Sequence, residues 1–289
     1  MSHPDLSALT LDNGGFAMLA IDQRESMRAM FADHQSESVT DAQLVAFKLD
    51  ALRVLTPLAS ACLLDRQFSW DAAVAEKVVA PSCGLIAAAD LFIADDDEIV
   101  ADVEIDREVR PETVKGDGAA AMKLLVTWRP DQDPDRRIAM VEEFIGLCRQ
   151  AGLISIIEPV SRRARDGRDT DLAAGIIAAA QELGALGADV YKAEMPLYGK
   201  GGEATVRAEC ARLSGIIDSP WVVLSSGVDP DDFPTAVEWA CKEGARGFLA
   251  GRAVWKNCIS APDRTAALRE DAVGRLQRLR QVVLDHVSA

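Results

Sequence analysis

Short apolar runs alternate with stretches of helical spacing along the whole 289-residue chain. The runs are continuous rather than alternating, which is typical of strands buried on both faces. Between them, apolar residues recur with the period of a helix, as over residues 40–58, where Thr40 or Ser38 is the expected cap. The expected strands cover residues 16–22, 61–65, 84–89, 122–128, 153–158, 188–194, 221–226 and 247–251.

Eight strands followed by helices predict an α/β fold, a (β/α)8 TIM barrel, as a single domain over residues 1–289. A doubly wound sheet is the competing fold, but no GxGxxG motif follows the first strand. Residues 90–118 are acid-rich and lack a clean period, so they predict an inserted hairpin or surface excursion. Gly187 is expected in the left-handed conformation that closes the helix predicted over residues 170–186.

The composition of the chain argues against several classes of function. Lys and Arg number 31 against 46 Asp and Glu, and the resulting charge of −15 argues against binding to nucleic acid or an anionic membrane. Six scattered cysteines without a CxxC pair are expected in the core, and three histidines without ligand spacing argue against zinc. We therefore expect no cofactor, although a carboxylate-bound magnesium stays open. No transmembrane-length apolar run or signal-peptide core is present, which predicts a cytoplasmic protein.

Lys192 lies inside the apolar strand predicted over residues 188–194, with Val190 and Glu194 on the same side. A buried, unpaired ammonium is costly and tends to lose its proton. The neutral amine is a nucleophile toward carbonyls, the first step of Schiff-base chemistry. The alternative is a lysine whose stem packs and whose head reaches water or a carboxylate such as Glu194.

Other polar residues stand at the carboxyl ends of the predicted strands, where TIM barrels place their chemistry. Asp22 ends the first strand, Lys123 lies in the fourth and Glu158 ends the fifth. With Lys192 they suit carbon–carbon cleavage through an imine, in which Glu158 shuttles protons and Asp22 orients hydroxyls or the amine. Lys123, as a second cation, would favour neutral Lys192. The alternative for both carboxylates is helix capping or pairing with arginines such as Arg24.

The position of Lys123 poses a difficulty. If its strand runs from Met122 to Trp128, Lys123 lies about 16 Å below the rim at ~3.3 Å per residue. A lysine side chain cannot cover that distance. Either the strand begins before Met122 and bends outward by Thr127, or Lys123 is not catalytic.

Two glycine-containing loops follow the last two strands, Ser225-Ser226-Gly227 and Gly251-Arg252. Glycine lets the backbone approach an anion closely, and barrels often bind phosphate at these two loops. The two loops together predict an anion site, whereas either alone would suit an ordinary tight turn. Further donors for a second anionic group are Gln23, Arg24, Arg162, Arg163, Arg165 and Lys200.

Five segments carry a family resemblance: GGFAMLAIDQRESMRAMF, SIIEPV, DVYKAEMPLYGKG, WVVLSSGVD and GFLAGRAVW. They resemble the bacterial sulfofructose-phosphate aldolases of sulfoquinovose catabolism, which are similar to class I tagatose-bisphosphate aldolases. The likeness covers nearly the whole chain and is weakest over residues 90–118 and at both ends. It implies a TIM barrel without a metal. It places Lys192 in the Schiff-base role, Glu158 in the acid/base role and Lys123 in the second-lysine role, with Ser226, Gly251 and Arg252 in the anion-binding loops.

The resemblance implies cleavage of 6-deoxy-6-sulfofructose 1-phosphate to dihydroxyacetone phosphate and 3-sulfolactaldehyde. The tagatose enzymes typically read DQRG where this chain has Glu25 after Arg24, which favours the sulfo-sugar. The alternatives are an aldolase for bisphosphorylated ketohexoses and a non-catalytic barrel that binds phosphosugars. The expected partner is a small-molecule sugar phosphate or sulfonate, and many such barrels are homo-oligomers.

Overall fold

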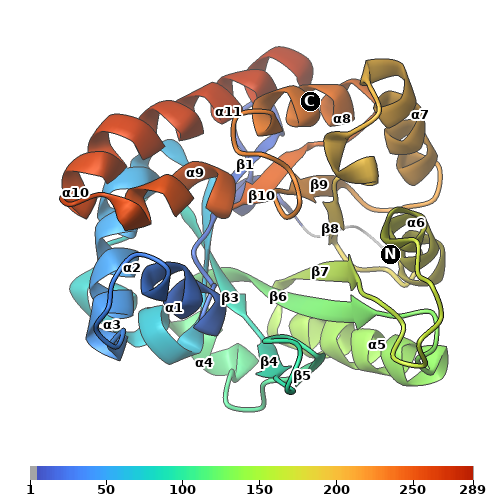
Figure 1. Cartoon of the computed structure of the whole chain (residues 1–289), viewed down its shortest axis with the longest axis horizontal. Helices are drawn as coiled ribbons and strands as arrows, with labels where there is room; N and C mark the ends of the chain where they lie inside the picture. Colours follow the sequence, from blue (N-terminus) through green and yellow to red (C-terminus); the bar gives the residue numbers. More distant parts are fainter. Residues whose placement is uncertain (1–4, 289) are drawn as a thin grey trace.

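The computed structural model describes residues 5–288. Eight parallel strands close into a barrel in the order β1-β10-β9-β8-β7-β6-β3-β2, and helices surround it (Figure 1). The predicted (β/α)8 TIM barrel is therefore confirmed. Its strands are β1 (Phe16–Ala20), β2 (Ala61–Leu64), β3 (Gly84–Ala88), β6 (Ala119–Trp128), β7 (Ile154–Ser161), β8 (Val190–Glu194), β9 (Trp221–Leu224) and β10 (Gly247–Ala250).

Two of the long helices begin at side-chain caps, and Thr40 was one of the two expected for α2 (Asp41–Leu55). Thr40 forms a capping box with Gln43, and the Asp133 side chain accepts a hydrogen bond from the Asp135 N–H. The helices are α1 (Glu25–Ala32), α2 (Asp41–Leu55), α3 (Asp71–Glu76), α4 (Pro111–Gly116), α5 (Pro134–Ala151), α6 (Leu172–Leu183), α7 (Glu203–Ser214), α8 (Phe233–Lys242), α9 (Arg252–Trp255), α10 (Arg264–Ala267) and α11 (Val273–His286).

The prediction that Gly187 closes a helix is wrong. Helix α6 ends at Leu183, and its C-cap is Gly184, in the right-handed region with φ −68°. The Gly184 carbonyl then accepts a hydrogen bond from the Asp218 N–H, at 3.2 Å, which ties the end of α6 to the loop before β9. Gly187 does have φ 85°, but it turns the chain within the following loop.

The barrel interior is apolar in its lower layers and charged at its carboxyl end. Interior side chains include Ala20, Ala88, Ala121, Ile156 and Val190. Successive side chains of a strand alternate between faces, so the residue two positions further along points the same way. The residues two positions further along are Asp22, Asp90, Lys123, Glu158 and Lys192, respectively. Asp22 and Asp90 lie just past the ends of β1 and β3.

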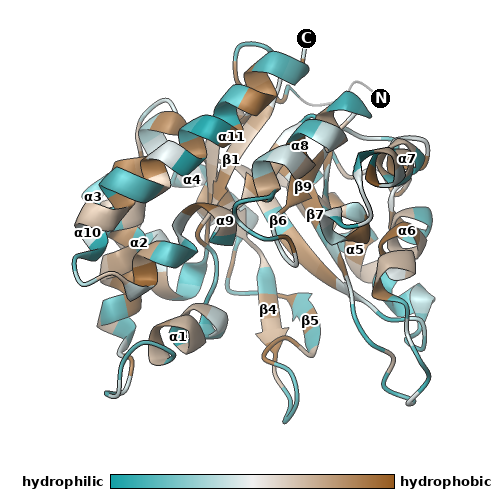
Figure 2. Cartoon of the chain, turned by 45° about the horizontal axis from the view of Figure 1, so that its top comes forward, coloured by the Kyte–Doolittle hydropathy of each residue, from teal (hydrophilic) through white to brown (hydrophobic). Residues whose placement is uncertain are grey.

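A two-stranded antiparallel hairpin, β4 (Asp90–Ile93) and β5 (Asp102–Ile105), follows β3 and forms a separate sheet that projects from one end of the barrel (Figure 2). Strand β6 begins at Ala119, before Met122, and Lys123 pairs in register with Ala88, the last residue of β3. The end of β3 marks the edge of the closed barrel here, because β6 and β7 continue beyond it as a pair, up to Trp128 and Ser161. Lys123 is therefore at the carboxyl edge of the barrel, and the difficulty of its reach disappears.

All six cysteines are buried and unpaired, as predicted. No helix within residues 5–288 is both long and apolar enough to cross a membrane.

Candidate active site

Lys192 projects from β8 into the barrel and is 4% exposed. Its Nζ lies 2.8 Å from Oε1 of Glu158, on the neighbouring strand β7. The two residues meet because Ile157 and Tyr191, just before them, pair in register. Glu194, the other carboxylate considered for Lys192, instead accepts a hydrogen bond of 2.7 Å from the Ser161 N–H. An amine and a carboxylate in direct contact can exchange a proton.

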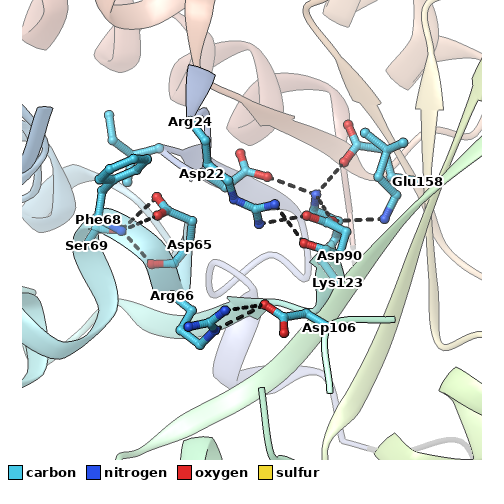
Figure 3. Close-up of polar contacts among 12 residues, drawn as sticks. Asp22, Arg24, Asp65, Arg66, Phe68, Ser69, Asp90, Asp106, Lys123 and Glu158 are labelled. Carbon is cyan, nitrogen blue, oxygen red and sulfur yellow. Dashed lines mark hydrogen bonds and ion pairs between the residues drawn. The ribbon is translucent and has the colours of Figure 1, made fainter. Parts of the chain in front are cut away.

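Lys123 is completely buried and lies among three carboxylates (Figure 3). Its Nζ is 2.8 Å from Oδ2 of Asp22, 2.7 Å from Oδ2 of Asp90 and 3.0 Å from Oε2 of Glu158. Burial alone would lower the pKa of Lys123, but these negative charges outweigh it and raise the pKa well above its usual value. Lys123 is therefore a permanent ammonium that holds the three carboxylates in place.

Asp22 is buried and stays ionised. Burial would raise the pKa of its carboxyl, but the charges of Lys123 and Lys192 lower that pKa below its usual range. Asp22 does not cap α1, whose N-cap is Arg24 and has no side-chain cap bond. The alternative that Asp22 serves as a helix cap is therefore wrong.

Asp90 is a central residue of the site that sequence reasoning missed. Its Oδ1 lies 2.8 Å from NH2 of Arg24, and its Oδ2 accepts hydrogen bonds from Lys123 and, at 3.0 Å, from the Leu125 N–H. Arg24 also donates to the Asp90 carbonyl at 2.7 Å, and its guanidinium lies 4.3 Å from the centre of the Phe92 ring. Arg24, which was predicted to bind substrate, thus also anchors the hairpin, and it lines a cavity of about 340 Å³ beside β4.

A second buried ion pair contacts the backbone next to Asp22. Lys48 of α2 forms an ion pair with Asp65, which follows β2, and both side chains are completely buried. Lys48 also donates to the Ile21 carbonyl at 2.9 Å, just before Asp22. Burial lowers the pKa of Lys48, although the charge of Asp65 opposes the shift. Asp65 in turn accepts hydrogen bonds from the Phe68 N–H and the Ser69 hydroxyl.

These contacts define a central charge set of four cations and four anions, all buried: Arg24, Lys48, Lys123 and Lys192 with Asp22, Asp65, Asp90 and Glu158. Its formal charge is zero. A proton that moves from Lys192 to Glu158 leaves that sum unchanged, whereas loss of a proton to solvent would leave an uncompensated buried charge. Glu158 binds both lysines, so it moderates the repulsion that the sequence predicted between them.

The two predicted anion loops follow the adjacent strands β9 and β10. Ser225 is buried, Ser226 is half-buried and Arg252 is exposed. Two glycines are required here: a Cβ on Gly251 would lie 2.2 Å from the Ala20 carbonyl oxygen, and Gly227 has φ 79° with the Tyr198 ring against it.

Gln23 follows β1, the strand next to β10 in the barrel. Its Oε1 is buried without a hydrogen-bond partner within residues 5–288. A buried, unpaired amide oxygen next to Asp22 is available to a ligand. Within residues 5–288, no group of three His, Cys, Asp or Glu residues has an arrangement that could hold a metal ion.

Two curated proteins resemble this chain over most of its length. Tagatose 1,6-diphosphate aldolase 2 of Enterococcus faecalis is 29% identical over 284 residues, covering 88% of this chain and 83% of that protein. Tagatose 1,6-diphosphate aldolase of Listeria innocua is 28% identical over 292 residues, covering 92% and 85%.

Two solved structures share the fold. An archaeal fructose 1,6-bisphosphate aldolase superposes with a TM-score of 0.65 at 17% identity, covering 97% of this chain and 98% of that one. The fructose-bisphosphate aldolase of Slackia heliotrinireducens gives 0.64 at 17% identity, covering 96% and 88%. Residues 16–257 match the DeoC/LacD family aldolase profile, so the chain belongs to the DeoC/LacD family and is an aldehyde-lyase.

Proposed function

We propose that this aldolase works through a Schiff base on Lys192, without a metal. The observation that carries the proposal is the 2.8 Å contact between Lys192 Nζ and Glu158 Oε1, while Lys123 holds the other oxygen of Glu158. Glu158 is thereby oriented toward the amine and has a direct route for its proton.

In the first stage Lys192 passes a proton to Glu158, and the neutral amine attacks the C2 carbonyl of a ketose 1-phosphate. Glu158 then returns a proton to the new hydroxyl, which leaves as water and gives an iminium ion. Lys192 is again positively charged, so the central charge set stays balanced in both states.

In the second stage the Glu158 carboxylate removes the proton of the C4 hydroxyl. The C3–C4 bond breaks, its electron pair moves to the iminium nitrogen as an enamine, and the aldehyde leaves. Protonation of the enamine at C3 and addition of water then release dihydroxyacetone phosphate and the free amine. Lys123 and Asp22 keep Glu158 and the substrate hydroxyls in position throughout.

The proposed substrate is 6-deoxy-6-sulfofructose 1-phosphate, cleaved to dihydroxyacetone phosphate and 3-sulfolactaldehyde. The motif resemblance supports it, as does Glu25 in place of the glycine of DQRG. Ser225, Ser226, Gly227, Gly251 and Arg252 would hold one anionic end, while Gln23 and Arg24 would face the other.

A tagatose or fructose 1,6-bisphosphate is the second candidate substrate, because curated relatives at 26–29% identity are named tagatose 1,6-diphosphate aldolases. The ratio of kcat/KM for the sulfonate and the phosphate substrates decides between the two. A non-catalytic phosphosugar-binding barrel, the third reading, predicts binding without cleavage of either.

The mechanism is tested by borohydride reduction in the presence of dihydroxyacetone phosphate. We expect a covalent adduct on the peptide that contains Lys192, none in Lys192→Met, and activity that EDTA leaves intact. An unmodified Lys192 peptide in an active enzyme would reject the imine mechanism.

A further inference from the structure

Glu194 differs from every other buried carboxylate within residues 5–288. Six carboxylates are buried there, and five form ion pairs with lysine or arginine: Asp22, Asp65, Asp90, Asp106 and Glu158. Glu194 is 3% exposed and has no cationic partner within ion-pair distance in the described chain. Its one hydrogen bond is from the Ser161 N–H to Oε2.

Glu194 also lies close to the proposed catalytic lysine. It lies two residues beyond Lys192 on β8, on the same interior face and nearer the open end of the barrel. The charged and titratable groups around it are Glu158 of β7, Arg162 after β7, Arg252 at the start of α9, Tyr191 of β8 and Tyr198 after β8. Arg252 begins α9 directly after β10, so it lies at the same carboxyl end of the barrel.

A buried carboxylate without a cation is held near its protonated form. Burial raises the pKa of Glu194 to about 7, against the opposing effects of the Ser161 N–H and Arg162. An anion that binds beside Arg252 adds negative charge at the mouth and removes water, and both effects favour the protonated carboxyl further. The protonated carboxyl is a hydrogen-bond donor, whereas the ionised form would repel the anion.

We propose that Glu194 is a proton-linked substrate-binding residue, which takes up a proton from solvent when a phosphate- or sulfonate-bearing ligand binds and donates that proton in a hydrogen bond to the ligand. The inference deepens the proposed function and rests on it, because it requires an anion at the mouth of the barrel. No covalent bond of Glu194 changes, and release of the ligand returns the proton.

The test is calorimetric titration of Lys192→Met with dihydroxyacetone phosphate, in which binding stays non-covalent. Proton uptake is obtained from the binding heat in two buffers of different ionisation enthalpy. From a pKa of about 7, we expect uptake of about 0.9 proton per site at about pH 8 and about 0.1 at about pH 6. Lys192→Met with Glu194→Gln should bind the ligand without this uptake, and Glu203→Gln, at an exposed carboxylate of α7, should keep it.

The outcomes separate the two proposals. Tight binding without uptake, or equal uptake in the Glu194→Gln protein, overturns the role of Glu194 and leaves the aldolase mechanism standing. Absence of any binding to Lys192→Met counts against the proposed function and against this inference with it. Uptake that disappears only with Glu194→Gln supports it.

Discussion

Asp90 accepts a hydrogen bond of 2.7 Å from Lys123, and its second oxygen holds Arg24 at 2.8 Å. One completely buried carboxylate thus fixes a lysine of β6 and an arginine after β1 at the root of the hairpin. Replacement of Asp90 by Asn keeps the shape but leaves two buried cations short of one negative charge.

We therefore expect Asp90→Asn to lower the free energy of unfolding by about 3–5 kcal/mol, as when one partner of a buried ion pair is lost. Urea unfolding near neutral pH measures this loss. Asp96→Asn, at an exposed carboxylate of the same hairpin, is the matched control and should change little. Equal stabilities of the two variants would show that Asp90 is not needed to balance the site.

Glu158→Gln removes the proposed proton carrier but keeps a side chain of the same length between the two lysines. We expect kcat to fall by about 10²–10⁴-fold, the usual contribution of a positioned acid/base group. Borohydride trapping should still label Lys192, only more slowly. Glu142→Gln, on the exposed face of α5, is the control. Unchanged kcat in Glu158→Gln would assign proton transfer to another group.

The buried pair of Lys48 and Asp65 is suited to a double-mutant cycle. Lys48→Met and Asp65→Asn each leave one buried charge, so each should destabilise the fold by about 3–5 kcal/mol. The double variant leaves none, and we expect it to be more stable than the sum of the single losses predicts. Urea unfolding of the four proteins gives the coupling energy, and strict additivity would show that the pair does not act as a unit.

Glu194 makes stability depend on pH in the direction opposite to a paired carboxylate. Its pKa is about 7 in the folded chain, above the usual 4.5. Between these values the folded state binds more protons than the unfolded state, so the free energy of unfolding falls as pH rises. The loss should reach about 3 kcal/mol, since each pKa unit corresponds to about 1.4 kcal/mol.

Glu194→Gln should remove that loss. The free energy of unfolding of the variant relative to the wild type is expected to increase from about pH 5 to about pH 8, and urea unfolding at both pH values measures it. Other titrating groups cancel in the difference. A difference that does not change with pH would contradict the raised pKa of Glu194.

Gly227→Ala tests the loop after β9. The position has φ 79°, and a Cβ would lie 2.5 Å from the Tyr198 ring. We expect a cost of about 1–3 kcal/mol and a raised KM for the anionic substrate, because the loop must shift. Gly146→Ala in α5 has nothing within 4 Å and should stabilise the fold by about 0.5–1 kcal/mol. A variant Gly227→Ala with normal KM would separate this loop from anion binding.

The barrel could be predicted from sequence because each strand is buried on both faces and therefore forms a continuous apolar run. The end of β7 could not be predicted from sequence. β6 and β7 remain paired as far as Trp128 and Ser161, so β7 continues past Glu158 and Pro159. Hydrogen bonds between backbones leave no mark in side-chain polarity.

The candidate site was predicted only in part. Lys192, Glu158, Lys123 and Asp22 stood out because they end or interrupt apolar strands, and the structure brings them together. Asp90 lies in a segment without a period, although it follows interior Ala88 by two positions. Lys48 looks like a surface lysine of α2, yet it shares the buried face of Leu44, Leu52 and Leu55.

The neutrality of the central charge set bears on how substrate arrives. If the buried cations and anions cancel, the chain's −15 belongs to its exterior. The proposed multiply charged sugar substrate would then diffuse toward an enzyme that repels it, until it reaches the proposed anion site at Arg252. Ionic strength shortens the reach of that repulsion, so added salt should speed the encounter, the reverse of electrostatic steering.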